Sequence, residues 1–132
     1  MTTVVADTDV VSLIFKDHSL SDKYLDAIDG KNVVLSFMTL AELELWTERH
    51  SSGAARRERL SKFLTRFSIR HSDPTLCRAW ASIRQQAFVA GNPVDVADAW
   101  IAATAVHLDA PLVSHNRRHF ENIEGLELIS VR

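Results

Sequence analysis

The sequence predicts a three-layer α/β/α fold, in which helices cover both faces of a central, mostly parallel β-sheet. Strand-like and helix-like segments alternate along the 132 residues, which is typical of parallel strands joined by crossover helices. The first two strand-like segments, 3–6 and 32–36, are short and rich in valine, as expected for strands buried on both faces. The length fits one domain over residues 1–132.

The predicted elements of the first half follow one another without a linker or a repeat. In order, they are strand 3–6, helix 9–15, helix 21–30, strand 32–36, helix 37–50, a basic helix 53–65 and strand 67–70. Gly30 is expected to end the second of these helices, and Ser36 or Thr39 to cap the third.

The second half begins with a long helix, 73–90, that starts at the pair Asp73-Pro74. Its apolar stripe is Leu76, Trp80, Ile83 and Ala87. A break at 91–93 precedes a helix over 95–108, capped by Asp95, and strands are expected at 111–114 and 126–129.

Composition and charge place the protein in a broad class. Apolar residues make up 46% of the chain and charged residues 24%, ordinary values for a soluble globular protein. Cys77 is the only cysteine, so we expect a reducing, cytoplasmic setting and a small buried side chain there. No signal peptide or membrane-spanning run is recognisable. A net charge of −2 argues against a bulk nucleic-acid coat, but not against a nuclease with clustered carboxylates.

Asp7 directly follows the apolar run 4–6 and is therefore expected at the carboxyl edge of a central strand. In α/β sheets, sites form beyond these strand ends, where the chain order reverses. A helix cap or turn in the loop Asp7-Thr8-Asp9 is an equally good interpretation.

Glu42 is the second candidate, because its helical neighbours Met38, Leu45 and Trp46 are apolar. A carboxylate among apolar side chains requires a cation or a hydrogen-bond network. The alternative is an exposed glutamate at the edge of the apolar stripe.

Asp98 is the third candidate, since Ile101, Ala102 and Ala105 share its helical face. The alternative is capping with Asp95, the interpretation that we favour for Asp95 itself. If Asp7, Glu42 and Asp98 converge, they repel one another unless a divalent cation joins them. Oxygen-only ligation favours Mg²⁺ or Mn²⁺ over zinc.

Four stretches together resemble a PIN-domain ribonuclease of the VapC toxin type, over nearly the whole chain. They are residues 5–12 (VADTDVVS), 36–43 (SFMTLAEL), 98–105 (DAWIAATA) and 111–120 (PLVSHNRRHF), followed by Gly125-Leu126. Each stretch is weak alone, but four in order at family-like spacing make a strong signal.

The resemblance implies an α/β/α PIN-like fold and Mg²⁺- or Mn²⁺-dependent hydrolysis of RNA phosphodiester bonds, in tRNA or rRNA or else in mRNA. It further implies a VapB-like antitoxin that blocks the site, contact with operator DNA only through that antitoxin, no membrane, and a homodimer.

The resemblance also assigns roles to residues. Asp7, Glu42 and Asp98 are the implied metal-binding and catalytic residues, and Thr8, Ser114 and Asn116 orient the site. His119 stands where many family members carry a fourth acid, which puts a second fixed metal in doubt. His119 then contacts RNA, assists a proton transfer or packs beside the next residue.

Basic residues offer further candidate contacts with RNA. Arg117 and Arg118 follow the strand that ends at Ser114, so they are expected near the site and in contact with phosphates. The basic helix is expected to be a solvated face, with an RNA contact as the alternative. His115 and His119 are four residues apart in a predicted loop, and zinc is disfavoured there. The three tryptophans are expected in the core or a dimer contact: Trp46, Trp80 and Trp100.

Two other functions fit part of the sequence. In a haloacid-dehalogenase-like phosphatase, Asp7 would be the nucleophile and Asp9 the acid–base, although the chain is short for that fold and has no lysine after Lys62. A degenerate PIN domain would bind RNA or a protein without cleaving, and His119 is the residue that keeps this alternative open.

Overall fold

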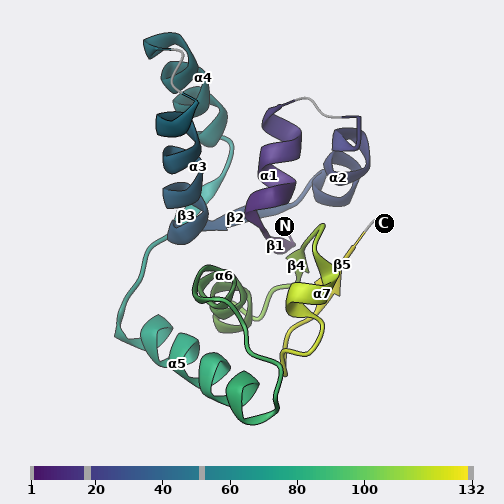
Figure 1. The fold of residues 1–132 in the computed structure, drawn as a ribbon. Helices are drawn as coiled ribbons and strands as arrows, with labels where there is room; N and C mark the ends of the chain where they lie inside the picture. Colours follow the sequence, from purple (N-terminus) through teal and green to yellow (C-terminus); the bar gives the residue numbers. More distant parts are fainter. Residues whose placement is uncertain (1, 17–18, 51–52, 131–132) are drawn as a thin grey trace.

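The computed structural model describes residues 2–16, 19–50 and 53–130, and these form one five-stranded sheet with helices around it (Figure 1). In chain order the elements are β1 Thr3–Ala6, α1 Thr8–Phe15, α2 Ser21–Ile28, β2 Asn32–Ser36, α3 Phe37–Arg49, α4 Ala54–Leu64, β3 Ser68–Arg70, α5 Pro74–Val89, α6 Val96–His107, β4 Leu112–Val113, α7 Arg117–Phe120 and β5 Leu128–Ile129.

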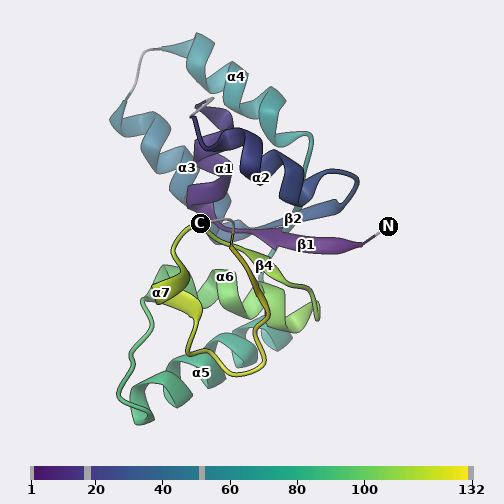
Figure 2. The ribbon, with the colours of Figure 1, turned by 90° about the vertical axis from the view of Figure 1, so that its right-hand side faces the viewer.

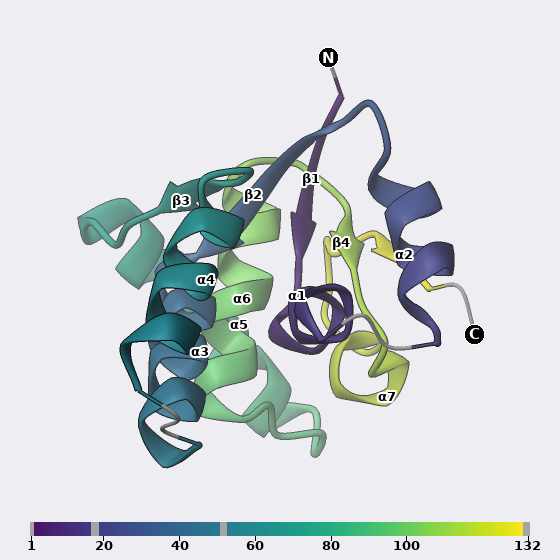
Figure 3. The same cartoon turned by 90° about the horizontal axis from the view of Figure 1, so that it is seen from above.

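All neighbouring strands of the sheet pair in parallel, in the order β3-β2-β1-β4-β5. The chain winds outward from β1 in one direction through β2 and β3, and in the other through β4 and β5. The order therefore reverses between β1 and β4, where a doubly wound sheet leaves a crevice at the carboxyl ends of its strands. Seen from above, α1 and α7 lie beyond this end of β1 and β4 (Figure 3).

The alternation of side chains along each strand divides the core into two clusters. Val4 and Val113 face the cluster under α1, α2 and α4, whereas Val5 and Leu112 face the cluster formed with α5 and α6. Figure 2 shows the result: α1 to α4 lie on one side of the sheet, and α5 to α7 on the other. The predicted three-layer α/β/α class is confirmed, and the sheet is wholly parallel.

Small side chains let α6 lie close to the sheet. Ala99, Ala102, Ala103 and Ala105 are all fully buried, so the helix backbone approaches the strands closely. On the far side of α6, Trp100 stacks against Trp80 of α5 with ring centroids 5.0 Å apart. This packing fixes the position of the first turn of α6, which carries Asp98.

Helix starts confirm several expected caps and correct one. Ser36 accepts a hydrogen bond from the Met38 amide at the start of α3, and Asp73 accepts one from Leu76 at the start of α5. Asp95 occupies the N-cap position of α6, but within the described residues its side chain makes no capping hydrogen bond. The expected N-cap position of Asp95 is therefore confirmed, but a cap by its side chain is not: its backbone carbonyl accepts from Ala99, and its side chain is exposed.

Two further expectations are corrected. Cys77 is exposed rather than buried, because it lies one residue past Leu76 on α5 and so points away from the buried stripe of Leu76 and Ile83. Residues 117–120, expected in a loop, form the single-turn helix α7. Phe120, only 2% exposed, anchors this turn in the core.

Within residues 2–16, 19–50 and 53–130, each helix lacks the combination of length and apolar character that crossing a membrane requires.

Candidate active site

Asp7 lies where β1 ends and α1 begins, at the crevice between β1 and β4. One carboxylate oxygen accepts from the Val10 amide (2.9 Å) and the other from the Ser114 hydroxyl (2.6 Å). Its own amide donates to the Val113 carbonyl of β4 (3.0 Å). Asp7 therefore caps α1, as one interpretation of the sequence held, and also turns an oxygen toward β4.

Burial raises the pKa of Asp7 from 3.8 to about 6. The hydrogen bonds from Ser114 and Val10 oppose this rise, while the charges of Asp9 and Asp98 add to it. Burial deprives the ionised Asp7 carboxylate of water, and its two hydrogen bonds compensate for this loss only in part. A cation bound nearby would therefore stabilise the ionised form.

Glu42 reaches the same region from α3, on the side of α1. Its Oε1 accepts from the Thr8 hydroxyl at 2.6 Å, and the same Thr8 oxygen lies 3.0 Å from the hydroxyl of Thr39, which is fully buried. The half-buried Glu42 therefore has the polar network that its apolar neighbours require. Thr8 joins the end of β1 to α3.

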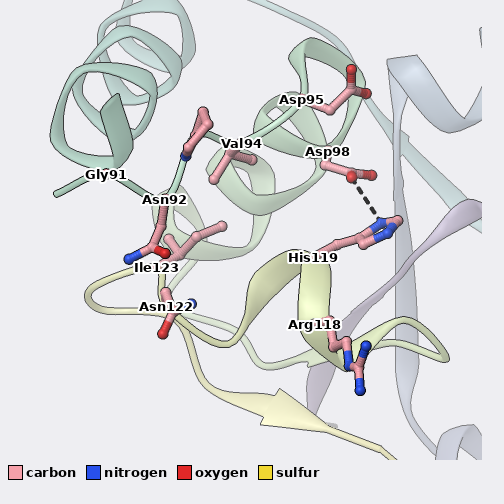
Figure 4. Close-up of a pocket in the computed structure, with 10 residues that line it drawn as sticks. Gly91, Asn92, Val94, Asp95, Asp98, Arg118, His119, Asn122 and Ile123 are labelled. Atoms are coloured by element: carbon pink, nitrogen blue, oxygen red, sulfur yellow. Dashed lines mark ion pairs between the residues drawn. The ribbon is translucent and has the colours of Figure 1, made fainter. Parts of the chain in front are cut away.

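Asp98 approaches from the first turn of α6. Its Oδ2 lies 3.1 Å from Nδ1 of His119, the contact drawn in Figure 4. Burial raises the pKa of Asp98; the charge of His119 opposes this rise, and the charges of Asp95, Glu42 and Asp9 reinforce it. His119 is therefore an immediate neighbour of a candidate metal ligand, as well as of Phe120, with ring centroids 6.3 Å apart.

The loop after β4 ties the site together. The Ser114 oxygen, fully buried, accepts from the Asn116 amide at 3.0 Å while its proton goes to Asp7. The Asn116 side chain donates to a carboxylate oxygen of Asp9. His115, which lies between Ser114 and Asn116 in the chain, is hydrogen-bonded through Nδ1 to the Tyr24 hydroxyl of α2 at 2.6 Å.

Two acidic residues of this region were missed as nuclease-site candidates. Asp9 raises the pKa of both Asp7 and Asp98, and Asp95 raises that of Asp98. The sequence signal for Asp9 is its place two residues after Asp7, beyond a buried strand, but that pattern assigns Asp9 a role only in the phosphatase alternative. For Asp95 the capping pattern outweighed any other signal.

The chemistry of the donor set fits a hard divalent cation. Asp98 raises the pKa of Asp7, and Glu42 raises that of Asp98, so the three carboxylates are electrostatic neighbours. Their ligand atoms are all oxygens, which suits Mg²⁺ or Mn²⁺. As the side chains stand, however, no three His, Cys, Asp or Glu side chains of the described residues are grouped as ligands of one ion. Present partners hold the carboxylates, namely Val10, Ser114, Thr8 and His119. Sharing an ion requires some of them to turn.

Two pockets flank α7, and one of the three carboxylates, Asp98, lines the first of them. The first, of about 400 Å³, extends from Asp98 to the loop between α5 and α6 (Figure 4). The second, of about 700 Å³, includes Asn116 and Arg117. Arg118 and His119 line both pockets, so they stand on the ridge between them.

The remaining cations divide between this ridge and other surfaces. Arg117 is exposed and lies 3.7 Å from Glu121. In the basic helix α4, Arg57 pairs with Glu44 and Glu48 of α3, at 2.9 and 2.5 Å. The solvated-face interpretation fits Arg57, whose side chain is 48% exposed. The cations of α4 are not among the residues lining either pocket beside α7.

Comparison with known proteins places this architecture in a family. The family model for the PIN domain matches residues 4–126. Among curated proteins, "Ribonuclease VapC1" of Haemophilus influenzae (strain R2866) is 23% identical over 126 residues, which is 92% of each chain.

Solved structures show the same fold. A VapBC2 structure from Rickettsia felis, bound to a DNA fragment from their promoter, has a TM-score of 0.88 at 20% identity, covering 99% of this chain and 100% of that one. FitAcB from Neisseria gonorrhoeae has a TM-score of 0.84 at 25% identity, covering 96% of both chains. Since the family model spans all but the first three and last six residues, the chain belongs to the PIN-domain family.

Proposed function

We propose that this protein is a metal-dependent endoribonuclease that acts as the toxin of a VapBC-type toxin–antitoxin pair. The observation that carries the proposal is that Asp7, Glu42 and Asp98, from the end of β1, α3 and α6, are electrostatic neighbours at the carboxyl ends of the strands of a PIN domain. Similarity to proteins named ribonuclease VapC1 supports RNA as the substrate. tRNA or rRNA is the proposed target, with mRNA as the alternative.

Asp7, Glu42 and Asp98 are the proposed ligands of Mg²⁺, which Mn²⁺ could replace. Bound there, the ion would lower the pKa of a coordinated water and offset negative charge on the phosphate oxygens. Ser114 and the Val10 amide hold the Asp7 carboxylate in place, and Thr8 holds that of Glu42. No serine or cysteine nucleophile is required.

The residues around the carboxylates position the substrate. Asn116 braces the loop after β4 through Asp9 and Ser114. Arg117 and Arg118 are the proposed phosphate contacts, because both are exposed cations on α7 beside Asn116. His119 lies beside Asp98, with its Nδ1 3.1 Å from the Asp98 carboxylate.

A VapB-like antitoxin is the proposed partner, since the similar solved structures include VapBC complexes, one of them from Salmonella typhimurium bound to DNA. Contact with operator DNA would then pass through the antitoxin. A cytoplasmic location and a homodimer are part of the same proposal.

The proposal is tested by incubating the purified protein with total cellular RNA, with and without Mg²⁺, and mapping new ends. We expect discrete, Mg²⁺-dependent cuts. Asp7→Asn and Asp98→Asn should reduce the cleavage rate by about 100-fold or more, as for the loss of a group that stabilises transition-state charge. Asp22→Asn, an exposed acid on α2, is the matched control and should cleave like the natural protein.

The other candidates give different outcomes. RNA that is bound but stays intact with every divalent ion would replace the nuclease with a binding-only PIN domain, the alternative that His119 keeps open. A covalent phosphate on Asp7 after incubation with a phosphomonoester would identify a phosphatase instead.

A further inference from the structure

The pocket beside Asp98 combines a larger polar surface with a smaller apolar one, and two asparagines stand on its rim. Val94 and Ile123 are each 8% exposed and, with Pro93, supply apolar surface. Asn92 comes from the loop between α5 and α6, and Asn122 from the segment after α7. Figure 4 shows both side chains on the side of the pocket away from Asp98. We call this space the Asn92 pocket.

The two asparagine side chains are available to a ligand. Both residues are exposed, and across ranges 2–16, 19–50 and 53–130 neither side-chain amide makes a hydrogen bond. The Asn92 backbone, by contrast, is fixed, because its amide donates to the Ala87 carbonyl at 3.0 Å. Each carboxamide offers both donors and an acceptor. The rim therefore carries uncommitted polar groups on an anchored backbone.

A nucleobase has the complementary shape and chemistry. Its faces are flat and suit apolar surface, while its edge carries hydrogen-bond donors and acceptors. Proteins that recognise RNA sequence take up such unstacked bases from single strands and read their edges with polar groups. A volume of about 400 Å³ falls within the size range of small-ligand sites.

The position of the pocket indicates which nucleotide along the RNA strand would place its base there. Asp98 belongs both to the pocket lining and to the carboxylate cluster. Arg118 and His119 line the pocket and continue over the ridge into the second pocket. A strand whose phosphates follow this ridge past the Arg118 guanidinium would place one base against Asn92 and Asn122 while the adjoining phosphate lies at Asp98.

We propose that the Asn92 pocket is a base-recognition subsite for the nucleotide beside the scissile phosphate of a single-stranded RNA. The side chains of Asn92 and Asn122 select which base is accepted at that nucleotide. This inference rests on the proposed ribonuclease function and adds the residues that decide where the RNA is cut.

The test is cleavage of a pool of short RNAs randomised on both sides of a cut site, with sequencing of the products. The natural protein should show a base preference at one position next to the cut. The double variant Asn92→Ala/Asn122→Ala should flatten that preference by about tenfold, the size expected for a lost pair of base contacts.

Gln85→Ala is the matched control, since Gln85 is an exposed carboxamide of α5 that does not line the pocket. It should leave both rate and preference unchanged. An unaltered preference profile in the double variant would overturn the subsite, and so would a large loss of total cleavage with the preference retained.

A second measurement separates failure of the subsite from failure of the nuclease. The protein is titrated in EDTA with each of the four ribonucleoside 5′-monophosphates, while NMR follows the side-chain amides of Asn92 and Asn122. Shifts that occur at lower concentration for one base than for the others would support the subsite even if RNA is never cleaved. If all four nucleotides leave both amides unshifted, the subsite is wrong whatever the protein does to RNA.

Discussion

At the scale of single residues, the site is held together by side chains that each satisfy a buried carboxylate. Asp7 is 3% exposed, and its pKa lies near 6 instead of at 3.8. Because the folded protein holds this proton more tightly than the unfolded chain does, the associated stability is fully present below about pH 3.8. It is lost as the pH rises through about 6. Without a metal, the ionised Asp7 therefore weakens the fold at neutral pH.

Asp7→Asn should accordingly stabilise the metal-free protein while removing its function. At pH 8 the free energy of unfolding should rise by about 1–3 kcal/mol, since each unit of pKa shift corresponds to about 1.4 kcal/mol. The difference should shrink toward zero at pH 4. Urea unfolding in EDTA at both pH values measures it, and a variant less stable than the natural protein at pH 8 would contradict the account of Asp7.

Ser114→Ala should have the opposite effect and lower the free energy of unfolding. The Ser114 hydroxyl donates to one Asp7 oxygen and accepts from the Asn116 amide. Its loss leaves both of these groups without that partner. We expect a loss of about 1–3 kcal/mol in unfolding free energy at pH 8, together with weaker Mg²⁺ binding by calorimetry. Ser130→Ala, on the rim of the second pocket, is the control, and equal effects of the two changes would argue against a special role for Ser114.

At the scale of elements, local patterns predicted most helices and strands but not the contacts between them. The valines of β1 and β2 and the Asp73-Pro74 start of α5 are local signals, and each element formed where expected. The turn α7 was missed because it is only four residues long, and burial of Phe120 against distant elements stabilises it. The link between α2 and the loop after β4, through Tyr24 and His115, spans 91 residues and has no sequence signature.

Tyr24→Phe removes the hydroxyl that makes this link. The ring of Tyr24, 1% exposed, should keep its packing, while His115 loses a 2.6 Å hydrogen bond. The expected cost is about 1 kcal/mol in chemical unfolding. Comparison with His115→Ala and with the double variant should give a smaller combined loss than the sum of the two single losses. A strictly additive result would show that the contact contributes nothing.

At the scale of the whole molecule, the predicted fold class is confirmed, and the choice of three carboxylates remains a prediction; both follow from simple regularities of the sequence. Alternating elements imply a parallel sheet, and the apolar surroundings of Glu42 and Asp98 mark acids that face inward. The pairing of Asp9 with Asn116 and the exposure of Asp95 depend on exact loop paths. Those paths are set by tertiary packing, which no local pattern encodes.

The division of the core by the sheet leads to a prediction about additivity. Ile101, 2% exposed, belongs to the α5–α6 side, and Val4, fully buried, to the opposite side. Ile101→Val should cost about 1 kcal/mol and Val4→Ala about 2 kcal/mol. Because the two clusters share no side chains, the double variant should lose their sum to within about 0.5 kcal/mol in denaturant unfolding. A larger deviation from the sum of the two unfolding free-energy losses would mean that packing changes on one side of the sheet affect the other side.

The hydrogen bond between Asp7 and Ser114 joins residues 107 positions apart in the chain. A fragment that ends between Asp98 and Ser114 carries all three proposed metal ligands, yet it lacks the hydroxyl that holds Asp7. Such fragments should consequently be harmless to a cell. If the protein is a toxin, its toxicity depends on residues that follow all three carboxylates in the chain.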